Sequence, residues 1–223
     1  MAIHERVWER DAPSQRMQML PEWRPLGTWT LLGIIGAVYI LQQLVGTTLG
    51  AYAHWFLFGI GNLPTELGNG WWLRPWTLIT STLSHSPNNL THILFNGLVL
   101  FFFGPILERI LGLKRFLTWF FITGAVSGVL QILITGGLAL GASGALMFVF
   151  GCLAIIMPNE KVLFWGIIPM PFWAMGILYA FLDVVGAINP YSSVGNFAHL
   201  SGMAMGLWYG WKLKQNARQP GLK

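Results

Sequence analysis

Charged residues are scarce in this chain: of 223 residues, 13 are Lys or Arg and 8 are Asp or Glu, together 9%. A soluble domain carries roughly 25%. Cysteine is scarcer still, because Cys152 stands alone, which excludes a disulfide within the chain and a metal site built from cysteines. Hydrophobic residues make up 54% of the chain, which excludes disordered and collagen-like classes. The composition predicts an integral membrane protein.

A surplus of basic residues gives the chain a net charge of +5 and a pI of about 9.7. Nucleic-acid binding requires basic side chains gathered on one polar face. Here they stand at the ends of apolar runs instead. We therefore expect the lipid bilayer, and not nucleic acid, as the chain's surroundings.

Six apolar runs bounded by charged residues, Pro or Gly approach the length of about 20 residues that a membrane-spanning helix needs. The expected fold class is therefore an all-α polytopic membrane protein with a six-helix bundle. The fourth run has only 15 residues, so its first residue should lie below the membrane surface. The runs are Gly27 to Gly46, Leu90 to Ile110, Phe116 to Gly136, Ser143 to Met157, Val162 to Val185 and Gly195 to Trp211.

The long connection from Thr47 to Asn89 is unusually apolar and rich in Trp. Short apolar stretches of about 10 to 14 residues favour an interfacial or re-entrant position, and Trp prefers the headgroup level. We expect an external interfacial loop here, within a membrane domain of residues 27–211. Residues 1–26 are expected to form a polar tail without the apolar core of a signal peptide, and residues 212–223 a second tail.

Basic residues near helix ends predict the orientation, because cytoplasmic loops carry an excess of Lys and Arg. With six spans, 12 of the 13 basic residues fall on one side, and only Arg74 falls on the other. Both termini are therefore predicted to be cytoplasmic. A cell membrane of a prokaryote is the expected location, since the N-terminal tail mixes Arg with acidic residues, unlike an organelle transit peptide.

Four polar residues fall at membrane depth, where burying such groups is costly and usually serves a function. His92 and Asn96 share a face of the second run at i, i+4 spacing, Ser143 begins the fourth run, and His199 lies near the start of the sixth. All three runs are expected to run inward. The four side chains should therefore lie at one shallow depth near the external face.

Ser143 heads a helix in the sequence Gly141-Ala142-Ser143-Gly144, where small neighbours allow close approach and free backbone N–H groups could stabilise an oxyanion. Gly202 and Gly206 form a small-xxx-small face that would bring His199 close to it. Each element has a plainer interpretation: the serine as a helix cap or packing site, the histidine as a structural hydrogen-bonding residue, and His92 with Asn96 as an interhelical clasp.

Taken together, these residues resemble the rhomboid family of intramembrane serine proteases, over roughly residues 27–211. The resemblance rests on His92-Ile93-Leu94-Phe95-Asn96, on Gly141-Ala142-Ser143-Gly144, and on Ala198-His199 followed by Gly202 and Gly206. Weaker agreement comes from Trp72, Arg74, Glu108-Arg109 and Gly112.

The resemblance implies a protease that cleaves transmembrane segments of other proteins, with no metal or cofactor. Ser143 would be the nucleophile and His199 the general base of a dyad. His92, Asn96 and the Ser143 backbone N–H would stabilise the oxyanion. The oligomeric state and the physiological substrate are not indicated.

Three further residues are open to more than one interpretation. Asp183 could orient His199, but we favour a water-exposed helix cap or loop anchor. Ser201 is a rival nucleophile on a different helix face from His199. His85 could hold water for hydrolysis or could lie in a plain surface loop.

Two features depart from the usual arrangement. Met147 stands where many family members have a Tyr that stacks on the catalytic His, and a thioether can still pack on an imidazole. Pro169 and Pro171 are expected to kink or break the fifth helix, the lateral gate proposed in the family, as a hinge or a static kink.

Other function classes fit less well. A rhomboid-like protein that binds membrane clients without cutting them usually lacks the Ser or the His, and both are present here. A small transporter would also fit six helices, but the sequence lacks an inverted repeat and a chain of intramembrane acids or bases.

Overall fold

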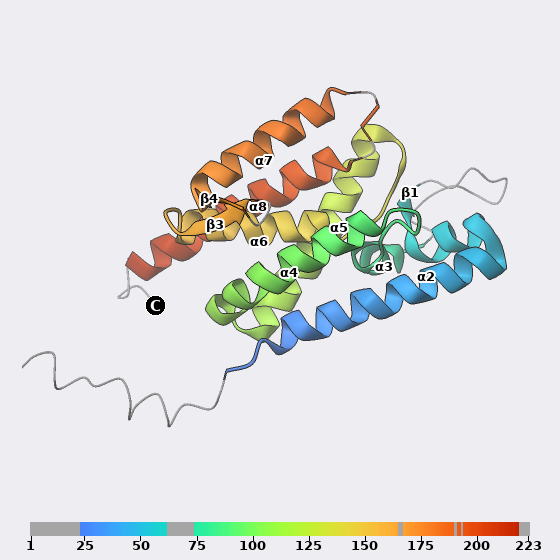
Figure 1. Cartoon of the computed structure of the whole chain (residues 1–223), viewed down its shortest axis with the longest axis horizontal. Coiled ribbons are helices and arrows are strands. Elements are labelled where there is room, and N and C mark those ends of the chain that lie inside the picture. Colours follow the sequence, from blue (N-terminus) through green and yellow to red (C-terminus); the bar gives the residue numbers. More distant parts are fainter. Residues whose placement is uncertain (1–22, 62–73, 165–166, 190, 193, 219–223) are drawn as a thin grey trace, which may run out of the picture.

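The computed structural model describes residues 23–61, 74–164, 167–189, 191–192 and 194–218, and it is mostly helical (Figure 1). Two small antiparallel sheets of two strands each, β1 with β2 and β3 with β4, lie among the helices. In chain order the elements are α2 (Leu26–Phe58), β1 (Ile60–Gly61), α3 (Thr77–Leu83), α4 (Leu90–Leu111), α5 (Leu113–Thr135), β2 (Leu138–Ala139), α6 (Ser143–Ile156), β3 (Lys161–Phe164), β4 (Ile168–Pro171), α7 (Phe172–Ala187) and α8 (Asn196–Arg218).

Each of the six predicted runs contains a helix, which confirms the predicted fold class. Helices α2, α4 and α5 each contain a span of 22 or 23 residues that is long and apolar enough to cross a membrane. Helices α6 and α7 are shorter and also apolar. Large hydrophobic side chains remain exposed on α2, α4, α5 and α7, as expected for surfaces that face lipid.

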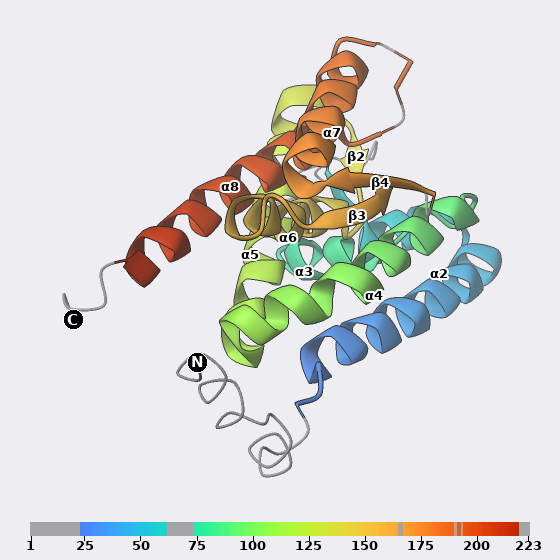
Figure 2. The same cartoon turned by 60° about the vertical axis from the view of Figure 1, so that its left-hand side comes forward.

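Helix α6 occupies the centre of the bundle, with α4, α5, α7 and α8 around it and α2 on the far side of α4 (Figures 1 and 2). Ten of its 14 residues are buried. A helix that is apolar on every side is stable only when neighbours cover all of it. The run that the sequence predicts to be short is therefore a helix that other helices enclose.

The contact between α6 and α8 depends on glycines. A Cβ atom at Gly202 would collide with the backbone carbonyl of Gly144, and one at Gly206 would collide with that of Phe148. The two backbones can lie this close only because neither glycine carries a side chain. The predicted small-xxx-small contact is confirmed.

A buried carboxylate joins α4 to the beginning of α2. Glu108 Oε1 accepts a hydrogen bond from the Gly27 amide at 2.8 Å, and Oε2 accepts from the Thr28 amide and hydroxyl, each at 2.8 Å. The first amides of a helix have no partner within it. Glu108 satisfies two of them and fixes where α2 meets the bundle.

The prediction for the fifth run was wrong at its beginning. Lys161–Phe164 (β3) pairs antiparallel with Ile168–Pro171 (β4), and α7 begins only at Phe172 (Figure 2). Pro169 pairs with Leu163 and Pro171 with Lys161, so neither proline kinks a helix. A hairpin of two strands has free edges that tolerate residues without an N–H, and Pro171 directly precedes the helix, where a missing donor costs little.

The long connection is more structured than predicted. Helix α2 continues past Gly46 to Phe58, β1 pairs with β2, and the short helix α3 follows. The guanidinium of Arg74 donates to the carbonyl of Gly59 at 3.2 Å, which joins the end of α2 to the residues that precede α3. Trp71 and Trp72 lie outside the described residues. The external position and the predicted domain boundaries stay predictions, although α8 extends beyond Trp211 to Arg218.

Candidate active site

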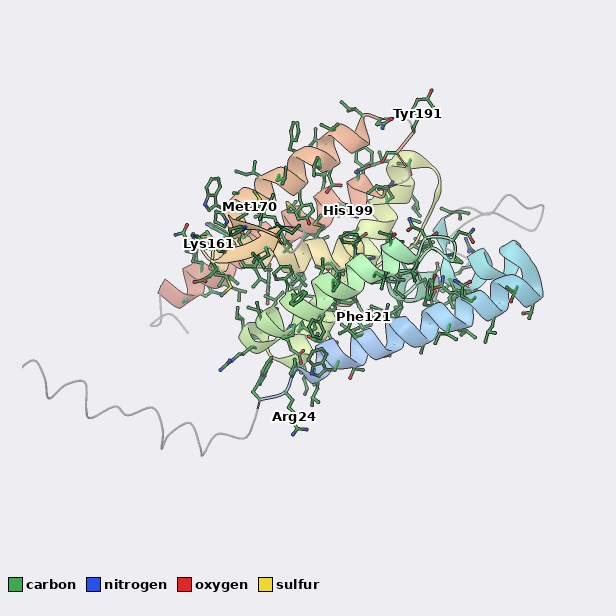
Figure 3. The ribbon with its side chains drawn as sticks, viewed as in Figure 1. Arg24, Phe121, Lys161, Met170, Tyr191 and His199 are labelled. Atoms are coloured by element: carbon green, nitrogen blue, oxygen red, sulfur yellow. The ribbon has the colours of Figure 1, made fainter. Side chains whose placement is uncertain are left out.

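The four predicted site residues surround one cavity of about 840 Å³. His92 and Asn96 reach it from α4, Ser143 from the start of α6 and His199 from α8. Figure 3 labels His199 in the region where α8 passes α6 and α7. The N-terminal parts of three separate helices thus meet at one cavity, with Asn96 in the second turn of α4.

The loop before α6 places Ser143 at the cavity. Gly141 has a φ of +131°, and its amide donates to the carbonyl of Ser81 at 2.8 Å. A Cβ at Gly141 would lie 2.9 Å from His92 Nε2 and 3.7 Å from Ser143 Oγ. Only glycine suits this backbone and this gap. The turn therefore lies between the imidazole of His92 and the hydroxyl of Ser143.

The start of α6 also lies against the start of α8. A Cβ at Gly144 would come within 3.5 Å of the Ala198 carbonyl, one residue before His199. Ser143 and His199 therefore line the cavity from adjacent helix ends. The amides of the first turn of α6 point out of the helix, where a negative charge would be stabilised.

Hydrogen bonding settles which nitrogen of His92 carries the proton. The Ser86 amide donates to Nδ1 at 3.4 Å, so the neutral ring carries its proton on Nε2. That nitrogen faces Gly141. His92 can thus donate a hydrogen bond at the place where the Ser143 loop passes.

Asn96 is held by His85. The distance between Asn96 Nδ2 and His85 Nε2 is 2.8 Å, and because an amide nitrogen only donates, His85 accepts at Nε2. His85 is fully buried, and Gln42 both donates to its carbonyl and accepts from its amide. Burial, aided by the neighbouring His92, lowers the pKa of His85 to about 3. The surface-loop interpretation of His85 was wrong, while a role in holding water stays a prediction.

Asp183 is buried and contacts His199, unlike its favoured interpretation. Its Oδ1 atom lies 2.9 Å from His199 Nδ1, and Asn196 Nδ2 donates to the same oxygen at 2.9 Å. The residue is 5% exposed, so the water-exposed cap that we favoured is wrong. The bond to Asn196 does link α7 to the start of α8, as the loop anchor in the favoured interpretation would. Sequence reasoning gave too little weight to the contact with His199.

Acyl transfer uses a nucleophilic hydroxyl, a base and hydrogen-bond donors for the oxyanion. The site has a hydroxyl at a helix N-terminus, an imidazole on the adjacent helix and two neutral side-chain donors. A protein-family model described as the Rhomboid domain matches residues 73–216, well over half of the chain. The chain belongs to the rhomboid family.

Relatives in this family match over 63% to 96% of the chain. The "Rhomboid protein 1, mitochondrial" of Saccharomyces cerevisiae is 27% identical, covering 96% of this chain and 72% of that protein. The "Rhomboid protease GlpG" of Haemophilus influenzae is 34% identical over 64% of the chain and 73% of its own length. The "Putative rhomboid protease YdcA" of Bacillus subtilis is 36% identical over 63% and 66%.

Ser201 and Met147 are the two other residues of this rhomboid protein that the sequence singled out near the site. Ser201 donates to the Ala198 carbonyl at 3.0 Å and to Ser127 Oγ at 3.3 Å, and it is not among the residues that line the cavity. Met147 is half-buried and packs against the hydrophobic core. Its packing on the His199 imidazole stays a prediction.

Proposed function

We propose that this rhomboid family member is a serine protease that hydrolyses peptide bonds in or near transmembrane segments of other membrane proteins. The observation that carries the proposal is the meeting of Ser143, His199, His92 and Asn96 around one cavity. The names of the relatives, two of which include the word protease, support the same activity.

In the proposed reaction, Ser143 Oγ attacks the carbonyl carbon of the substrate while His199 Nε2 takes the hydroxyl proton. The carbonyl oxygen becomes an oxyanion, and it accepts hydrogen bonds from His92 Nε2–H, Asn96 Nδ2–H and the Ser143 amide. Collapse breaks the C–N bond, and His199 returns the proton to the leaving amine. Water, activated by the same imidazole, then hydrolyses the ester on Ser143.

The substrate must present an extended backbone to this cavity. A transmembrane helix does so only where it unwinds, so segments with small or helix-breaking residues are the proposed substrates. Hydrolysis also requires water, and the polar side chains of Ser81, Asn89 and Gln131 line the cavity. A site of this composition supports water at a depth where lipid alone would exclude it.

The protein is a multi-pass integral membrane protein. Its orientation is part of the proposal: both termini face the cytoplasm, because the basic residues gather at the helix ends remote from the cavity. Cleavage would therefore take place toward the external face. A prokaryotic cell membrane stays the predicted location.

The test is the cleavage of a fluorescently labelled transmembrane peptide by the purified protein in lipid vesicles. Product should form with the wild-type protein and should fall to background with Ser143→Ala and with His199→Ala. Ser201→Ala is the matched control and should retain activity. Equal product from Ser143→Ala would defeat the proposal, and binding of the peptide without cleavage by the wild-type protein would indicate a client-binding protein instead.

A further inference from the structure

The contact between Asp183 and His199 joins two helices across a loop. Asp183 lies near the end of α7 and His199 in the first turn of α8, and Oδ1 and Nδ1 are 2.9 Å apart. Their side chains are 7% and 16% exposed, respectively. Water therefore competes little for this hydrogen bond, which strengthens it relative to one on the surface.

The carboxylate is held in place by its second partner. Asn196 donates to the same Oδ1 at 2.9 Å, and its own carbonyl oxygen accepts from Ser192 Oγ at 2.8 Å. A Cβ at Gly186 would collide with the Asn196 amide, so α7 closes directly onto this group. Asp183 is thus fixed by packing and by a hydrogen-bond network, independently of His199.

A carboxylate accepts hydrogen bonds and does not donate them when ionised. His199 must therefore carry its proton on Nδ1, which leaves the lone pair of Nε2 free. Nε2 is the nitrogen that must face Ser143 if the imidazole is to take the hydroxyl proton. The contact with Asp183 selects the one neutral tautomer of His199 that can act as a base.

The charge of Asp183 adds a second effect. Within the described part of the chain, its Oδ2 atom is buried without a hydrogen-bond partner, so the carboxylate is incompletely compensated at rest. When His199 takes the serine proton it becomes a cation directly beside this anion. The ion pair forms only as the reaction proceeds, which favours the transition state over the resting enzyme.

We infer that Asp183 is a positioning residue that orients His199 and stabilises its protonated form, so that the site works as a Ser143–His199–Asp183 triad. The inference rests on the proposed protease function. Asp183 touches no substrate and acts only through the imidazole.

The first measurement compares kcat and KM for Asp183→Asn, Asp183→Glu and Asn196→Ala in the vesicle assay. Asp183→Asn should lower kcat by on the order of 10-fold to 1,000-fold, with KM within about twofold. The loss of about 10⁴-fold that follows removal of the carboxylate from a serine protease triad is the upper limit. Asp183→Glu keeps the charge and should recover part of the loss. Asn196→Ala keeps the carboxylate but removes the loop anchor, so it should cost clearly less than Asp183→Asn.

The second measurement does not depend on activity. The ¹⁵N chemical shifts of histidine distinguish the Nδ1–H from the Nε2–H tautomer, and His199 is assigned by comparison with His199→Gln. The wild-type protein should show the Nδ1–H form, and Asp183→Asn should lose it or show a mixture, while Asn196→Ala should retain it.

The inference is overturned if wild-type His199 is the Nε2–H tautomer, a result that decides the matter even where Asp183→Asn does not fold. It is also overturned if Asp183→Asn retains the Nδ1–H tautomer of His199 and lowers kcat no more than Asn196→Ala does, because Asp183 would then only anchor the loop. If the wild-type protein cleaves nothing, the proposed function fails, and the tautomer measurement still tests the role of Asp183.

Discussion

Asn96 donates from Nδ2 to Nε2 of His85 over 2.8 Å, although His85 precedes α4 and lies away from the cavity lining. One of the two amide hydrogens of Asn96 is therefore committed to His85, which fixes the plane of the amide. In the proposed reaction, the second hydrogen would donate to the oxyanion in the cavity. His85 thus orients the amide of Asn96.

Replacing His85 by phenylalanine, which preserves the bulk of the ring, should misorient Asn96. Losing one oxyanion donor costs about 100-fold to 1,000-fold in rate, so a misdirected donor should cost on the order of 10-fold to 100-fold in kcat. A double-mutant cycle with Asn96→Ala measures the link. The double variant should be little slower than Asn96→Ala alone, whereas fully additive losses would show that His85 does not act through Asn96.

The buried His85 should also make the protein less stable in acid. Burial lowers its pKa from 6.5 to about 3. Between these pH values the unfolded chain binds a proton at His85 and the folded protein does not, so the free energy of unfolding falls as the pH is lowered from about 6.5 toward 3. Thermal unfolding midpoints between pH 7.5 and 4.5 should fall less steeply for His85→Phe than for the wild type. Equal slopes would contradict the assignment.

The close contact of α6 with α8 should be intolerant of a single methyl group. Gly202→Ala would place a Cβ against the Gly144 carbonyl, forcing the helices apart and moving His199 away from Ser143. We expect destabilisation of about 1–3 kcal/mol, the usual cost of overpacking, and a large fall in kcat. Gly33→Ala is the matched control, because a Cβ there meets no atom within 4 Å. Retention of full activity and unfolding midpoint by Gly202→Ala would show that the contact is looser than described.

Most of the site could be predicted because its chemistry sits on helices whose periodicity and length are visible in the sequence. Ser143, His92, Asn96 and His199 are polar residues in apolar runs, and the glycine spacing on α8 indicates which helix it meets. Those signals are local, since each depends on neighbours within a turn or two of helix.

The parts that sequence reasoning missed depend on how the chain folds back. An apolar run does not distinguish a hairpin from a helix start, so the sequence predicts that the fifth helix begins at Val162, whereas the structure begins it at Phe172. His85 and Asp183 lie in or beside connections, where polar residues are usually solvated. Their burial depends on Gln42 and Asn196, from other parts of the chain, which no pattern in the sequence pairs with them.

The central claim is that Ser143 is the nucleophile of a peptide-cleaving site. A fluorophosphonate forms a covalent bond to an activated serine oxygen with loss of fluoride, and peptide mapping by mass spectrometry locates the adduct. The measurement is the fraction of Ser143 labelled against the fraction of cleavage activity lost. We expect a single adduct on Ser143, with activity falling in direct proportion to labelling and no adduct in His199→Ala. An adduct on another serine, or full cleavage by completely labelled protein, would contradict the account.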